Sequence, residues 1–249
     1  MSRRDREEAA FLAAPDREAY LRAHSGLPGP RGNLELMDVA ATASDRADVE
    51  RWAALGPDVA PENTPEVFLV CCGVVGLGRL VAGGERAYLP RLRQLSNDAR
   101  WRVREAVAMA LQAWGDADTA ALVDEMDSWA VGTPLEGRAA MAALCEPRLL
   151  RDRRTVARTL AILDRLTAAV QDAPDGRAAD VRVLRQALGY GWSVAIAADV
   201  GIGLPALEPW LFDPTPDVRW IVRQNLGKAR LVRVAPDWVK RAEEALAPR

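Results

Sequence analysis

The sequence predicts an all-α fold, an α-solenoid or superhelix of antiparallel helix pairs. Three observations lead to this class: apolar residues recur at three- and four-residue steps along most of the chain, strand-like alternation is almost absent, and one helical segment recurs. The clearest helix covers residues 101–114, where Val103, Val107, Leu111 and Trp114 fall on one face.

Similar amphipathic runs follow one another with short connections that contain Gly or Pro, so successive helices should be antiparallel neighbours. The expected helices cover residues 5–13, 16–24, 34–43, 46–55, 65–82, 86–95, 101–114, 117–130, 135–145, 152–171, 178–189, 192–199, 204–212, 216–230 and 236–246.

The most apolar run extends from Val67 to Leu77 and stops at Arg79, whereas a membrane span needs about 20 apolar residues. We therefore expect a buried helix and no membrane partner. Its Gly-x-x-Gly-x-Gly sequence, residues 73–78, lacks the strand and Lys-Ser/Thr context of nucleotide-binding loops. We interpret these glycines, with the adjacent Cys71 and Cys72, as small residues at a close helix contact.

An internal repeat is the strongest sign of organisation. Residues 180–189 resemble residues 217–227 at an offset of 37, and residues 103–111 and 137–144 match less closely. The arginines that align in the four segments are Arg104, Arg138, Arg182 and Arg219. Their spacing of 34 to 44 residues fits units of two helices that bury their apolar faces by stacking.

The sequences Asp-x-x-x-x-Val-Arg at residues 98–104 and Asp-Val-Arg at residues 180–182 and 217–219 resemble the start of the second helix of HEAT repeats. The resemblance covers residues 64–230 best and implies a single solenoid domain over residues 1–249, with residues 1–32 as an irregular N-terminal cap. It also implies a ladder of carboxylate–guanidinium pairs, which fits the planar fork of arginine. The ladder would join Asp98, Asp180 and Asp217 to Arg104, Arg138, Arg182 or Arg219.

The wider chain resembles bacterial HEAT-like proteins that are distantly similar to alkylpurine DNA glycosylases. The resemblance implies a cationic, aromatic-bearing concave face for duplex DNA and a catalytic aspartate shortly after a tryptophan. Here Asp124 and Asp127 precede Trp129, and no other motif supplies a nucleophile with a base. We therefore assign no catalytic residue.

Composition narrows the function classes further. The 249 residues are 49% apolar and 27% charged, as in ordinary globular proteins. One histidine, His24, and three cysteines without a C-x-x-C pair predict no metal site, no cofactor and no disulfide framework, which favours a cytoplasmic location. Residues 1–132 carry 15 basic and 21 acidic side chains, whereas residues 133–249 carry 18 and 14. An anionic partner should therefore prefer the second half.

Two arginine clusters stand in that half. Arg148 lies in a turn, and Arg151, Arg154 and Arg158 have the spacing of one helical face. This face either contacts phosphates or an acidic protein surface, or is the solvated start of a helix. The second cluster contains Arg219, Arg223, Lys228, Arg230 and Arg233. Equivalent positions of stacked repeats project from one face, so the clusters could line one groove.

The eight tryptophans divide into two sets. Trp52, Trp114, Trp210 and Trp238 are interpreted as core residues. Trp101, Trp129, Trp192 and Trp220 stand beside arginines, turns or polar groups, so they either pack at repeat junctions or expose an indole for stacking.

Two functions follow. The first is a non-catalytic scaffold that holds a protein partner on the concave face, and the second is recognition of duplex DNA or a damaged base. The candidate binding residues are Trp101, Arg148, Arg151, Arg154, Trp192, Trp220, Arg223 and Arg230.

Overall fold

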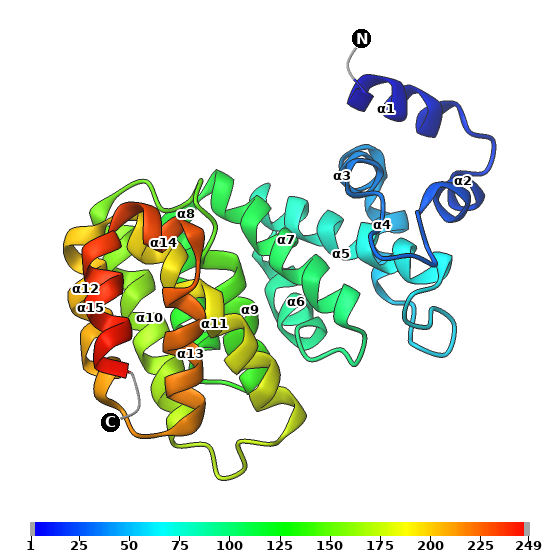
Figure 1. The fold of residues 1–249 in the computed structure, drawn as a ribbon. Coiled ribbons are helices and arrows are strands. Elements are labelled where there is room, and N and C mark those ends of the chain that lie inside the picture. The colour runs from blue at the N-terminus through cyan, green and yellow to red at the C-terminus, as the bar shows by residue number, and fades with distance from the viewer. Residues whose placement is uncertain (1–2, 247–249) are drawn as a thin grey trace. The chain divides into compact units, whose positions relative to one another are not determined.

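The computed structural model describes residues 3–246 and confirms that this part of the chain is all-helical. It contains fifteen α-helices, two short 3-10 helices and no strand among the described residues. The chain is organised as two compact units, unit 1 (Met1–Ala117) and unit 2 (Asp118–Arg249). Unit 1 is coloured blue to green in Figure 1, and unit 2 green to red.

Unit 1 is organised around the long helix α5, which contacts α2, α3, α4, α6 and α7. The elements of unit 1 are α1 (Arg3–Ala13), α2 (Arg17–His24), α3 (Leu34–Ala43), α4 (Arg46–Ala53), α5 (Pro65–Ala82), η1 (Arg86–Tyr88), α6 (Leu89–Leu95) and α7 (Trp101–Ala117). Among the described helices, α5 alone is long and apolar enough to cross a membrane by length and composition, yet 72% of it is buried inside the protein. It is therefore the buried core helix that the sequence predicted.

The glycines of α5 confirm the close helix contact. A Cβ atom at Gly73 would lie 2.5 Å from the backbone nitrogen of Ala53 in α4, and one at Gly78 would lie 2.4 Å from Cα of Ala110 in α7. Only hydrogen fits at these positions, so both neighbouring helices approach the α5 backbone itself. Cys71 and Cys72 are buried in the same helix.

A buried arginine fixes the turn before α7. Arg100 is 4% exposed, and its guanidinium binds the Asp98 carboxylate at 2.7 and 2.8 Å. The same group donates to the carbonyl oxygens of Leu55 at 3.1 Å and Ala60 at 3.0 Å. Because every contact is charge-assisted, the turn is joined firmly to the segment after α4.

Unit 2 is organised around α11, which contacts α9, α10, α12, α13 and α14 and lies between α9 and α13 in Figure 1. The elements of unit 2 are α8 (Thr119–Trp129), α9 (Pro134–Leu144), α10 (Arg153–Gln171), α11 (Ala179–Ala198), α12 (Val200–Leu207), η2 (Glu208–Phe212), α13 (Pro216–Leu226), α14 (Ala229–Val234) and α15 (Pro236–Leu246).

Several of the expected helix boundaries are wrong, including that of residues 204–212, which are the end of α12 and the 3-10 helix η2. The helices expected at 178–189 and 192–199 form the single helix α11, and the one expected at 216–230 is divided into α13 and α14. The glycines in α11 are packing positions, because a Cβ at Gly191 would lie 2.6 Å from Sδ of Met141 and one at Gly189 would lie 2.9 Å from the Trp220 ring. Tertiary contact thus outweighs the low helix propensity of glycine.

The carboxylate–guanidinium pairs also differ from the expected ladder. Asp217 of α13 pairs with Arg185 of α11, not with an aligned arginine, and Asp98 pairs with Arg100. Arg104 donates to the backbone oxygens of Asp98 and Ala99. The Asp217–Arg185 pair nevertheless joins the two helices that carry the best-matched repeat segments.

The tryptophan assignments are confirmed in part. Trp52 and Trp114 are buried core residues as expected. Trp210 and Trp238 are only half-buried, and their indole nitrogens donate to Asp164 and Glu208 respectively. Trp129, which was grouped with the residues that could stack, is fully buried and donates to Glu125 at 2.9 Å.

Candidate functional site

One predicted stacking residue is wrong. Trp192 is fully buried in α11, and its Nε1 donates a 3.0 Å hydrogen bond to Thr167 Oγ1 of α10. An indole in this position cannot reach a ligand. The polar neighbours that suggested an exposed site belong to the interior, because a buried indole N–H needs an acceptor.

The other two predicted tryptophans lie at least partly at the surface. Trp220 of α13 is half-buried, and the Arg185 guanidinium lies 4.8 Å from its ring centre, so one face is already covered. Trp101 begins α7 and is 47% exposed, with the guanidinium of Arg102 4.9 Å from its ring. Of the three, Trp101 presents the most accessible indole.

The first arginine cluster does not form one helical face. Arg151 precedes α10 and lies outside it, because Asp152 is the N-cap and accepts from the backbone N–H of Thr155 at 3.0 Å. The negative Asp152 also offsets the positive charges in the first turn of α10. Arg158 is occupied by an ion pair with Asp124 and another with Asp127.

The remaining arginines of this cluster differ in whether they are paired with a carboxylate. Arg148 is paired with Glu146 at 3.1 Å. Arg151 and Arg154 are exposed, and neither makes an ion pair with a described carboxylate. Both could therefore meet an external anion without breaking an internal pair.

The second cluster separates into two groups. Arg219 and Arg223 of α13 donate to the carbonyl oxygen of Leu246, at 3.3 and 3.2 Å, and so bind the last turn of α15. Lys228, Arg230 and Arg233 belong instead to α14 and its N-cap, and they line a cleft. Arg230 is thus the only residue of the eight predicted ones that lines this cleft.

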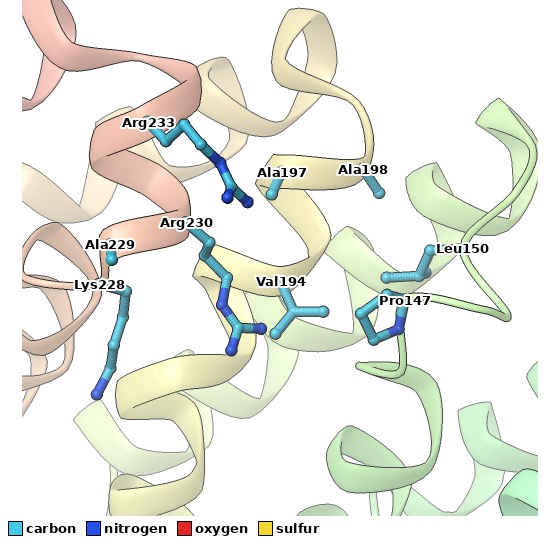
Figure 2. A pocket seen from close by; sticks show the side chains of 9 residues that line it. All are labelled: Pro147, Leu150, Val194, Ala197, Ala198, Lys228, Ala229, Arg230 and Arg233. Carbon is cyan, nitrogen blue, oxygen red and sulfur yellow. The ribbon is translucent and has the colours of Figure 1, made fainter.

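This basic cleft is a cavity of unit 2 with three cationic residues in its lining. Its volume is about 630 Å³, and it is lined by Pro147, Leu150, Val194, Ala197, Ala198, Lys228, Ala229, Arg230 and Arg233. Figure 2 shows the side chains of Arg230 and Arg233 extending from α14 toward the end of α11, where Val194 and Ala197 form an apolar floor. Pro147 and Leu150 supply the opposite wall, in the segment between α9 and α10.

The charged side chains that line the cleft are all positive. Three lining residues are cationic and none is acidic, and in the described part of the chain these three cations make no ion pair. The nearby Asp199 is paired with Arg153 at 3.2 Å and caps α12, so it does not neutralise the cleft. Three unpaired cations above an apolar floor favour a ligand that is both anionic and partly apolar.

One buried group near the cleft responds to this charge. Burial raises the pKa of the Cys145 thiol to about 12, although the Arg230 charge acts in the opposite direction. The thiol therefore stays protonated and neutral at physiological pH. Cys145 is a packing residue against Gly191 and supplies no nucleophile to the cleft.

Lys228 and Arg233, which line the cleft, are not among the candidate residues predicted from the sequence, although the sequence indicated the cluster that contains them. The three-residue step from Arg230 to Arg233 and the rarity of lysine, with only Lys228 and Lys240 in the chain, were the available signals. No sequence signal indicated that Pro147 and Leu150 would face them.

Metal sites in proteins are built from clustered His, Cys, Asp and Glu side chains. No group of three or more His, Cys, Asp or Glu side chains in residues 3–246 is placed to hold a metal ion. His24 ends α2, and its ring lies 4.2 Å from that of Tyr20.

Fold and site together define an all-helical protein whose second unit carries a basic cleft. Comparison of the chain with protein-family models, with curated proteins and with solved structures finds no match.

Proposed function

We propose that this chain is a non-catalytic binding module whose basic cleft holds an acidic, partly apolar segment of a protein partner. The observation that carries the proposal is the lining of the cleft, with Lys228, Arg230 and Arg233 but no carboxylate. An extended peptide with alternating acidic and apolar side chains could place carboxylates on the guanidinium groups and apolar groups on Val194 and Leu150.

We further propose that the helices form an α-solenoid of HEAT-like pairs, with the partner on its concave face. The recurring segments in α11 and α13 support this architecture, because the two helices pack directly and share the Arg185–Asp217 pair. A cytoplasmic location is also proposed, and three buried cysteines without a disulfide support it.

Binding of duplex DNA is the second candidate. The exposed Arg151 and Arg154, which have no described carboxylate partner, favour it. Against it, Trp192 is buried, Trp220 has one face covered by Arg185, and Arg223 is engaged by Leu246. Half of the residues expected to stack on a base or to hold phosphate, namely Arg148, Trp192, Trp220 and Arg223, are therefore buried or occupied.

Fluorescence anisotropy separates the two candidates. The probes are a labelled peptide of alternating Glu and Leu, and a labelled DNA duplex, each titrated at low and at moderate salt. The test variant is the pair Arg230→Glu and Arg233→Glu. The matched control is the pair Arg177→Glu and Arg182→Glu, which changes charge equally at two exposed positions of unit 2 outside the cleft.

The proposal expects the peptide to bind, the cleft variant to weaken binding by roughly tenfold or more, and the control to stay within about threefold of the parent. Absence of peptide binding at low salt overturns it, and so does equal weakening by both variants. A duplex that binds more tightly than the peptide, with an affinity that falls steeply with salt, overturns the protein partner in favour of DNA.

A further inference from the structure

Besides the basic cleft of unit 2, the protein has a cavity in unit 1 that the proposed function does not use. It has a volume of about 360 Å³ and lies between the loop that follows α2 and the helices α3, α5 and α7. Its interior is lined by Met37, Phe68, Cys71, Ala106 and Met109. Leu34 and Trp101 are at its mouth, and we name it the Trp101 pocket.

The mouth of the Trp101 pocket is unusually apolar. Leu34 is 56% exposed and Trp101 is 47% exposed, and both are among the few large hydrophobic side chains that remain in solvent. Two such residues around one cavity leave apolar surface in water that a ligand would cover at a gain of roughly 25 cal/mol per Å².

The polar groups of the pocket are few, and most are occupied. Arg102 pairs with Glu62 at 3.2 Å and donates to the oxygens of Gly29 at 2.6 Å and Asn63 at 2.9 Å. Glu105 already takes part in another interaction. Arg31 is exposed and makes no ion pair with any carboxylate that the structure describes, so it is the cation left to meet a ligand.

We propose that the Trp101 pocket binds a small organic acid with a flat, apolar body. The apolar body would lie against Phe68, Ala106 and Met109 beneath the Trp101 indole, and the carboxylate would meet the guanidinium of Arg31. The volume is at the lower end of the range for small-molecule sites, which fits a ligand of one or two rings.

Charge and shape each contribute to the choice of ligand. Arg102 is already neutralised by Glu62, and Glu105 takes part in another interaction, so Arg31 is the lining charge left for a ligand and an anion is preferred over a cation. A small acid without an apolar body would leave the interior empty. A neutral aromatic molecule would fill the interior but leave Arg31 unpaired.

Isothermal titration calorimetry on the full chain tests the proposal with three probes: naphthoate, its neutral analogue naphthalenemethanol, and acetate. The test variant is Arg31→Gln, which removes the charge at an exposed position. The matched control is Arg6→Gln, at an exposed arginine of α1 that does not line the pocket. Thermal unfolding of each variant verifies that the protein is folded.

The proposal expects naphthoate to bind with heat that saturates, naphthalenemethanol to bind at least about fivefold more weakly, and acetate to give no saturating heat. Arg31→Gln should bring naphthoate to the level of the neutral analogue, whereas Arg6→Gln should leave it unchanged. Binding should also change the emission of the exposed Trp101, and this change should vanish in Trp101→Phe.

Failure of naphthoate to bind the parent protein overturns the proposal, and so does equal affinity of the parent and Arg31→Gln. Binding of acetate as tight as that of naphthoate would show that the apolar interior is not used, which also overturns it. The outcome is independent of the peptide experiment, because the Trp101 pocket belongs to unit 1 and the basic cleft to unit 2.

Discussion

Trp192 Nε1 donates to Thr167 Oγ1 at 3.0 Å in the interior of unit 2, and Thr167 Oγ1 in turn donates to the carbonyl oxygen of Leu163 at 2.8 Å. The hydroxyl is therefore both donor and acceptor in a site without solvent. Thr159, two helical turns earlier in α10, is equally buried, but its hydroxyl has no hydrogen-bond partner in the described structure.

This contrast gives a paired prediction for two substitutions of the same shape. Thr167→Val should lower the free energy of unfolding by about 1–3 kcal/mol, because it leaves the indole N–H buried without an acceptor. Thr159→Val should be neutral or stabilising, since it removes a hydroxyl that gains nothing from burial. Urea denaturation of both variants measures the difference, and equal losses would contradict the assignment.

The buried Arg100 is expected to be the most sensitive charged residue of unit 1. Arg100→Ala should cost about 3–5 kcal/mol, because it removes the guanidinium that donates to the Asp98 carboxylate and to the buried oxygens of Leu55 and Ala60. Arg6→Ala, at an exposed position, should stay within about 0.5 kcal/mol of the parent. Chemical denaturation followed by circular dichroism compares them, and a small effect of Arg100→Ala would refute its role.

Close approach of α5 and α7 makes Gly78 intolerant of any side chain. Gly78→Ala should destabilise unit 1 by about 3 kcal/mol or prevent its folding, because the new Cβ would meet backbone atoms of Ala110 at 2.4 and 2.5 Å. Gly56 has no atom within 4 Å of an added Cβ, so Gly56→Ala should change stability by less than about 1 kcal/mol. Thermal unfolding of the two variants checks the expectation.

The three thiols should not react with thiol reagents in the folded protein. Burial raises the pKa of Cys71 to about 12 and that of Cys72 above its ordinary value, as it does for Cys145. A thiol with a pKa near 12 is ionised at roughly one part in ten thousand at pH 8. A disulfide reagent should therefore titrate no thiol of the native chain at pH 8 and all three in guanidinium chloride.

The same shift has a consequence for stability at alkaline pH. The folded state holds the thiol proton more tightly than the unfolded state, whose pKa is the ordinary 9.0. The contribution of Cys145 is therefore fully present below pH 9 and is lost as the pH rises from 9 toward 12. Cys145→Ala should show a shallower alkaline loss of stability than the parent, and an unchanged slope would contradict the raised pKa.

Much of the secondary structure could be predicted from the sequence, because it depends on local periodicity. The buried helix α5 and the packing role of Gly73 and Gly78 followed from apolar residues interrupted by small ones. The break predicted within α11 was wrong, because the chain alone does not reveal that Met141 and Trp220 occupy the space beside Gly191 and Gly189.

The residues that line the candidate sites could be predicted only in part. Arg230 lines the basic cleft, and Trp101 lines the pocket of unit 1, but Trp192 is an interior residue. Whether an arginine is free depends on partners that are distant in sequence. Arg223 meets Leu246 of α15, and Arg230 meets no carboxylate in the described residues.

The sequence by itself determined that the chain is helical, where most helices begin and end, and that its second half carries the excess of cations, because these properties depend on residue type and short-range spacing. Only the tertiary structure decided which cations remain unpaired and which tryptophans reach solvent. Those properties depend on how helices separated by tens of residues approach one another, and that distance is set by side-chain packing.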